Sequence, residues 1–210
     1  MDATAETSRA ETPRGDSGVR RGGLVAEVSA ATALVVVAGL FHPIGGWAAA
    51  VLAPLAAVAA GRTGPPPWKG RATWAETARV ACVAAGVSLA AVAAAQVLLG
   101  RLHFRAPVEA LGAAFWCAAF AEEWFFRGYV QGRAAPTASP RDLRLFGARF
   151  GMPELLSAAL FAAAHAPRLG LGAVAILAPG AVFAWARSRT GGVAAPFFLH
   201  VVFNAWGKNL

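Results

Sequence analysis

The sequence predicts an all-α protein, a polytopic membrane bundle with about seven transmembrane helices. Of its 210 residues, 57% are hydrophobic and only 14% are charged, whereas soluble domains carry about 25% charged residues. The mean hydropathy is +0.53. The apolar residues fall in long blocks rather than alternating along the chain. Such blocks are typical of helices that cross a bilayer.

Residues 1–23 are expected to form a disordered cytoplasmic segment, because they are rich in charged and small polar residues and bury little apolar surface. Residues 24–210 are expected to form the transmembrane domain. Its apolar blocks predict seven helices, although several blocks are shorter than the ~20 residues that a perpendicular span needs. The blocks are 24–41, 46–60, 79–99, 107–132, 153–166, 171–186 and 193–206.

Two connections between the blocks stand out. Residues 61–74 contain three consecutive prolines, which predict a non-helical cytoplasmic loop. Residues 133–150 combine two prolines with basic and apolar residues, which indicates a short amphipathic piece on the inner surface of the membrane.

The positions of the basic residues predict the orientation. If the N-terminus is cytoplasmic and seven helices alternate, 14 of the 19 Lys and Arg residues lie inside, four outside and Arg127 in the membrane. Positive charge favours the cytoplasmic side, so we expect a multi-pass plasma-membrane protein with its N-terminus inside. The net charge of +8 therefore arises mainly from basic residues outside the apolar blocks. Nucleic acid is not an expected partner, because no basic face with interleaved aromatic residues is present.

A few polar residues interrupt the apolar blocks. Ionised groups at the centre of a membrane helix cost roughly 2.5–3.5 kcal/mol each on insertion scales, so they usually serve a function. At a rise of ~1.5 Å per residue, Glu122, His165, His200 and Asn204 lie about 15, 18, 10 and 16 Å from the inner ends of their helices. Three helices thus carry polar groups at similar depth, which predicts one shared site. The polar residues are Glu122, Glu123, Arg127, His165, His200 and Asn204.

The carboxylates differ in their expected partners. Glu123 and Arg127 are spaced i and i+4, so they are expected to form an ion pair along one helix face. Glu122 points about 100° away and is left free. A structural interpretation is also open, in which Glu122 is a second partner of Arg127.

The histidines lie on two other helices. His200 and Asn204 share one face, as do Phe161 and His165, so Phe161 is expected to form a wall of the site. These groups are open to a structural interpretation too, since His200 and Asn204 can form hydrogen bonds between helices. A carboxylate with an imidazole is sufficient to activate water, and a His–Asn pair can stabilise an oxyanion.

Three short motifs occur in order within the predicted helices. Together they resemble the CPBP family of intramembrane proteases, also called the CAAX-protease or Abi family, over about residues 107–206. The motifs are EExxxR at 122–127, FxxxH at 161–165 and HxxxN at 200–204.

This resemblance implies an intramembrane endopeptidase that cleaves a membrane-anchored protein or peptide substrate at or in the lipid bilayer. By analogy, Glu122 and His165 would activate water, and His200 and Asn204 would stabilise the oxyanion. Some bacterial relatives, the myxosortase-like group, resemble enzymes that process a C-terminal sorting signal. Among the activities of bacterial relatives, we rank this one first. The supporting residues would be Glu123, Arg127 and Phe161.

Other functions remain open on the sequence. Glu122, His165 and His200 also form a plausible zinc set, although we expect no obligatory metal. The same residues could relay protons or cations in a transporter, but no matching pair of Gly/Pro-broken helices supports this alternative. A non-catalytic immunity-type membrane protein is the third hypothesis.

Overall fold

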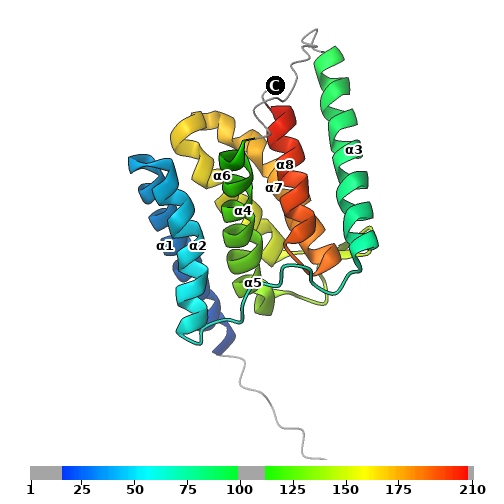
Figure 1. The fold of residues 1–210 in the computed structure, drawn as a ribbon. Helices are drawn as coiled ribbons and strands as arrows, with labels where there is room; N and C mark the ends of the chain where they lie inside the picture. The colour runs from blue at the N-terminus through cyan, green and yellow to red at the C-terminus, as the bar shows by residue number, and fades with distance from the viewer. Residues whose placement is uncertain (1–15, 99–111, 208–210) are drawn as a thin grey trace, which may run out of the picture.

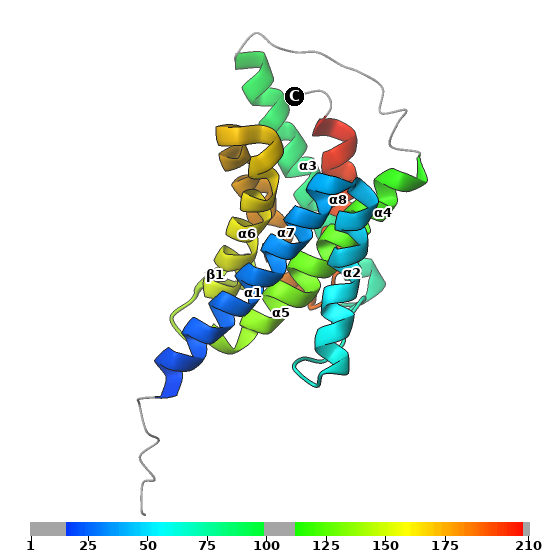
Figure 2. The same ribbon diagram turned by 90° about the vertical axis from the view of Figure 1, so that its left-hand side faces the viewer.

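The computed structural model describes residues 16–98 and 112–207, and within them each predicted apolar block lies in helical segments to within one residue at its ends. Successive segments run alternately from one end of the bundle to the other (Figures 1 and 2). The all-α prediction is therefore confirmed. The segments are α1 (Asp16–Phe41), α2 (Pro43–Ala59), α3 (Trp74–Leu98), the continuous helix of α4 (Ala113–Glu123), η2 (Trp124–Val130) and α5 (Gln131–Ala134), α6 (Met152–Leu169), α7 (Leu177–Thr190) and α8 (Ala194–Gly207).

Three segments of the described chain are long and apolar enough to cross a membrane: 22–41, 74–98 and 152–190. The last comprises α6, α7 and the intervening 3-10 turn η4 (Gly170–Ile176). Helices α2 and α8 are apolar but shorter, and the helix from α4 to α5 contains four charged residues. Seven membrane crossings thus remain a prediction.

The N-terminal boundary differs from the expected one. Helix α1 begins at Asp16, eight residues before the predicted start at residue 24. Most of the segment expected to be disordered, residues 1–15, lies outside the described residues, as do residues 99–111 and 208–210.

The segment 133–150 contains a β-hairpin instead of a purely amphipathic piece. After the 3-10 turn η3 (Ala135–Thr137), strands β1 (Leu143–Leu145) and β2 (Ala148–Phe150) pair antiparallel. Phe146 and Gly147 both have positive φ, at 47° and 80°, which produces a turn tight enough to join two strands.

The proline-rich loop 61–73 is non-helical, as predicted, and packs against the turn between α7 and α8. Its carbonyls at Pro67 and Trp68 accept hydrogen bonds from Val193 N (3.1 Å) and Ala194 N (2.9 Å), the first free N–H groups of α8. A β-carbon on Gly128 of η2 would lie only 2.7 Å from Pro66 Cβ, so this glycine allows close contact. The loop therefore fixes both η2 and the start of α8.

One end of the bundle collects the basic loops, and we call it the basic end. Here Arg71 N donates to Thr190 O (3.1 Å), and Arg189 Nη1 lies 2.6 Å from Glu76 Oε1. Trp185 Nε1 donates to Leu145 O at 2.9 Å and ties the hairpin to α7. The opposite end contains the α1–α2 turn at His42 and the C-terminal end of α6 (Figure 2).

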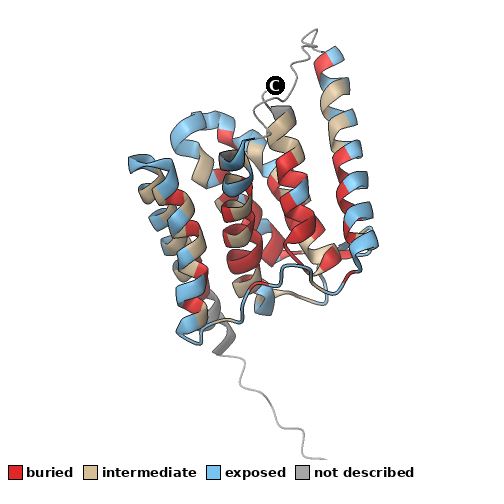
Figure 3. Ribbon diagram, viewed as in Figure 1, coloured by how far each residue is buried: buried red, intermediate tan, exposed pale blue. Residues whose placement is uncertain are grey.

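Buried residues concentrate in the centre of the bundle, around η2, α7 and α8 (Figure 3). Phe125, Val130 and Leu199 are fully buried there. The outer faces of α1 and α3 expose large aliphatic side chains, such as Leu34 and Val87. An apolar exterior around a core that contains charged groups is the arrangement expected in a bilayer.

Candidate active site

The site is built where α4 becomes the π-helix η2, between Glu123 and Trp124. A π-helical turn is wider than an α-turn and is frequent at functional sites. Ser157 Oγ of α6 donates to the carbonyl of Phe126 at 2.9 Å. This bond links the irregular turn to the helix that carries His165.

Glu123 and Arg127 form the expected ion pair in the core. Arg127 Nε lies 3.2 Å from Glu123 Oε2, and the two side chains are 0% and 1% exposed. Arg127 Nη2 also donates to Gly180 O of α7 at 3.0 Å. The guanidinium carbon lies 4.3 Å from the Phe161 ring centre, a favourable cation–π contact.

The other carboxylate faces both histidines. Glu122 Oε2 lies 3.9 Å from His165 Nε2 and 3.8 Å from His200 Nε2. The predicted convergence of three helices is therefore confirmed. These distances are too long for direct hydrogen bonds. Glu122 Oε2 is buried and has no hydrogen-bond partner among the described residues.

The hydrogen bonds of the two imidazoles define their roles. His165 Nδ1 lies 2.8 Å from Phe161 O, and His200 Nδ1 lies 2.7 Å from Glu123 Oε1. A carbonyl and a carboxylate only accept, so each Nδ1 carries a hydrogen. Both Nε2 atoms are directed toward Glu122, and in neutral His165 this atom is an acceptor.

Phe161 lies between the two histidines, as its spacing predicts. Its ring centre is 4.7 Å from that of His165 and 5.7 Å from that of His200. Asn204 lies one turn beyond His200 on α8, and no hydrogen bond of its side chain is recorded within the described part of the chain. Among the described residues, the structure thus brings Glu122, His165 and His200 together, but the Asn204 side chain forms no hydrogen bond with them.

Two partners were missed by the sequence reasoning. Ser157 shares a helix face with Phe161 and His165 at four-residue spacing, a signal that would have identified it. Gly180 contributes only its carbonyl to Arg127, and no sequence pattern identifies a backbone partner.

Residues 104–206 match the family model described as type II CAAX prenyl endopeptidase Rce1-like. The match covers 103 of the 210 residues, and over this region the chain is similar to the Rce1-like family. The chain has no significant match among curated proteins or solved structures. The family confirms the resemblance to CPBP proteases. Together with the three apolar segments, the match indicates a membrane protein, and proteases of the matched family act on membrane-associated protein or peptide substrates.

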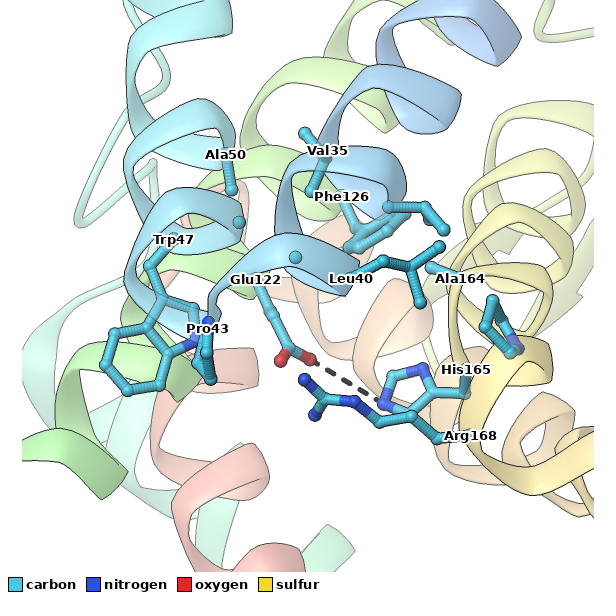
Figure 4. A pocket seen from close by; sticks show the side chains of 14 residues that line it. Val35, Leu40, Pro43, Trp47, Ala50, Glu122, Phe126, Ala164, His165 and Arg168 are labelled. Carbon is cyan, nitrogen blue, oxygen red and sulfur yellow. Dashed lines mark ion pairs between the residues drawn. The ribbon is translucent and has the colours of Figure 1, made fainter.

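All three motifs lie inside the Rce1-like region, but the cavity beside them extends beyond it. A cavity of about 100 Å³ is bounded on one side by Glu122, Phe126 and His165. Leu40, Pro43 and Trp47 also line it, and Figure 4 shows Pro43 and Trp47 across Glu122 from His165. These residues come from α1 and α2, which precede the family match. The site therefore has one Rce1-like wall and one wall from outside that region.

Metal ligation was a second interpretation of Glu122, His165 and His200. Within residues 16–98 and 112–207, no group of three His, Cys, Asp or Glu side chains is arranged to hold a metal ion.

Proposed function

We propose that this Rce1-like protein is an intramembrane endopeptidase in which Glu122 and His165 activate the attacking water. The observation that carries the proposal is the unpaired Oε2 atom of Glu122, which faces the Nε2 atoms of His165 and His200. A buried acceptor without a partner is unfavourable unless a ligand or water supplies the hydrogen bond.

In the proposed reaction, water donates one hydrogen to Glu122 Oε2 and the other to His165 Nε2. As the water oxygen bonds to the peptide carbonyl carbon, its proton moves to Glu122 and the carbonyl oxygen becomes an oxyanion. When the C–N bond breaks, Glu122 returns the proton to the leaving nitrogen. General acid–base catalysis of this kind contributes typically 10²- to 10⁴-fold.

His200 is proposed to stabilise the oxyanion. Its Nδ1–H is already donated to Glu123, so Nε2 becomes a donor only in the imidazolium form. In that form, the positive charges of Arg127 and His200 balance the negative charges of Glu122 and Glu123. Asn204, on the same helix, would supply a second donor after a substrate binds.

We further propose that the reaction needs no obligatory metal and that the substrate carries a C-terminal sorting signal. The first proposal rests on the acid–base set formed by Glu122 and His165. The second rests on the resemblance to the myxosortase-like group and on a site that lies within membrane helices.

The test is Glu122→Gln in the full chain. We expect cleavage to fall at least about 100-fold, because the amide cannot accept the proton. Comparative membrane proteomics of cells with the wild-type or variant chain would identify proteins that retain a terminal segment. Retained processing by Glu122→Gln would contradict the proposed mechanism.

Glu76→Gln is the matched control. Glu76 is 30% exposed, compared with 28% for Glu122, but it pairs with Arg189 at the basic end. We expect this variant to process substrates normally. Treatment of the purified wild-type protein with a chelator should leave cleavage unchanged. Loss of activity that zinc restores would instead identify Glu122, His165 and His200 as metal ligands.

A further inference from the structure

The cavity has a buried floor and an exposed rim. At its floor, Ala50 is 1% exposed and Phe126 is 2% exposed. At its rim, Leu40 is 61% exposed, and Pro43 and Arg168 are exposed too. The rim residues belong to the α1–α2 turn and the C-terminal end of α6. The cavity therefore opens at the end of the bundle opposite the basic end.

A packed layer separates the site from the basic end. From Glu122 toward α5, the residues Phe125–Val130 of η2 are all buried. The Glu123–Arg127 pair lies within this layer. Neither water nor a peptide has a route through such a close-packed interior. Glu122 is thus closed off from the basic end, and the cavity reaches it from the rim.

The two ends differ sharply in charge. The loops that meet at the basic end are among the segments that hold 14 of the 19 Lys and Arg residues in the alternating arrangement. The structure brings segments 61–73, 143–150 and 187–192 to this one end through hydrogen bonds and an ion pair. The positive-inside rule assigns that end to the cytoplasm.

From these observations, we infer that the active site opens toward the non-cytoplasmic face of the membrane. The substrates are then membrane-anchored proteins whose cleavage site reaches the non-cytoplasmic leaflet after transport across the membrane. A peptide segment that stays in the cytoplasm cannot reach Glu122. The substrate class rests on the proposed active site, whereas the direction of opening does not.

Cysteine labelling tests the direction of opening without requiring catalysis. The native Cys82 and Cys117 are free and exposed, so both are first replaced by alanine. Arg168→Cys then reports on the rim, and Arg144→Cys, exposed on β1, reports on the basic end. Intact cells are treated with a membrane-impermeant maleimide before or after permeabilisation.

We expect Arg168→Cys to be labelled in intact cells and Arg144→Cys only after permeabilisation. The reverse pattern, labelling of both in intact cells, or no labelling of the rim in either state would overturn the inference. If Arg168→Cys does not accumulate, Leu171→Cys replaces it, because Leu171 is 93% exposed at the same end.

The substrate class has a separate readout. In the proteomic comparison with Glu122→Gln, the cleavage site that borders each retained segment should lie on the non-cytoplasmic side of the membrane. Cleavage sites on the cytoplasmic side would overturn the inference while leaving the proposed catalytic role of Glu122 intact. Unchanged processing in Glu122→Gln would instead refute that role while the labelling result stands.

Discussion

Arg127 is the most buried charge in the site. Its removal should lower the free energy of unfolding by more than the ion pair with Glu123 contributes to it. Arg127→Met would leave the Glu123 carboxylate buried and partly unpaired, since only His200 would remain beside it. Breaking a buried pair by removing one partner typically destabilises a protein by about 3–5 kcal/mol. We expect that loss in unfolding experiments in mixed micelles.

The double variant Glu123→Gln/Arg127→Met supplies the control. It removes both charges, so it should be more stable than Arg127→Met alone, although inactive if Glu123 orients His200. Such non-additivity is the signature of two residues in direct contact. A double variant as unstable as the sum of the singles would show that the pair is energetically independent.

At the scale of single residues, much of the site could be predicted from the spacing of polar residues along the helices. The i and i+4 positions predicted the contact between Glu123 and Arg127, and matching depths predicted that Glu122 would meet two histidines. The wider η2 turn was not predictable, because it depends on the hydroxyl of Ser157 and on packing against Pro66. Partners distant in sequence leave no local pattern.

Among the helices, the α1–α2 pair depends on one close contact. A β-carbon on Gly46 would lie 2.8 Å from Gly39 Cα, so Gly46→Ala must push the two helices apart. Both glycines line the cavity, and the shift would move its outer wall. Overpacking of this kind costs typically 1–3 kcal/mol. We expect lower thermal stability in detergent and reduced cleavage.

Gly86→Ala is the matched control on α3. Nothing lies within 4 Å of a β-carbon at this position, and the helix propensity of alanine should stabilise the chain by up to about 1 kcal/mol. If Gly46→Ala behaved like Gly86→Ala, the close contact would have no role in the wall of the site.

Element boundaries followed apolar patterning only where helices are long. The blocks predicted where the long helices of the described chain lie, but the hairpin of β1 and β2 was missed because three-residue strands are too short for a clear periodicity. The contribution of α1 and α2 to the cavity was also missed. Their apolar residues carry no chemical signal, and the contact depends on how two helix pairs pack.

Across the whole molecule, charge placement predicted that the basic loops lie on one side of the membrane, and in the fold these loops gather at one end. The orientation with the N-terminus inside stays a prediction. The cavity could not be predicted, because it lies between the Rce1-like region and helices that precede it. The α1–α2 pair joins that region at the basic end, where Glu27 Oε2 accepts from Arg133 Nη2 at 2.7 Å and Glu27 Oε1 accepts from Tyr129 Oη at 2.9 Å.

This tie predicts a charge-reversal rescue. Glu27→Arg would place two cations together at the basic end and loosen α1 from α5, so the wall around the distant cavity would lose its anchor. The pair is about one quarter exposed, so we expect a loss of only about 1 kcal/mol in unfolding free energy, together with reduced cleavage. The double variant Glu27→Arg/Arg133→Glu re-creates an ion pair and should recover part of both properties. Equal defects in the single and double variants would mean that the ion pair does not hold the α1–α2 wall against the Rce1-like region.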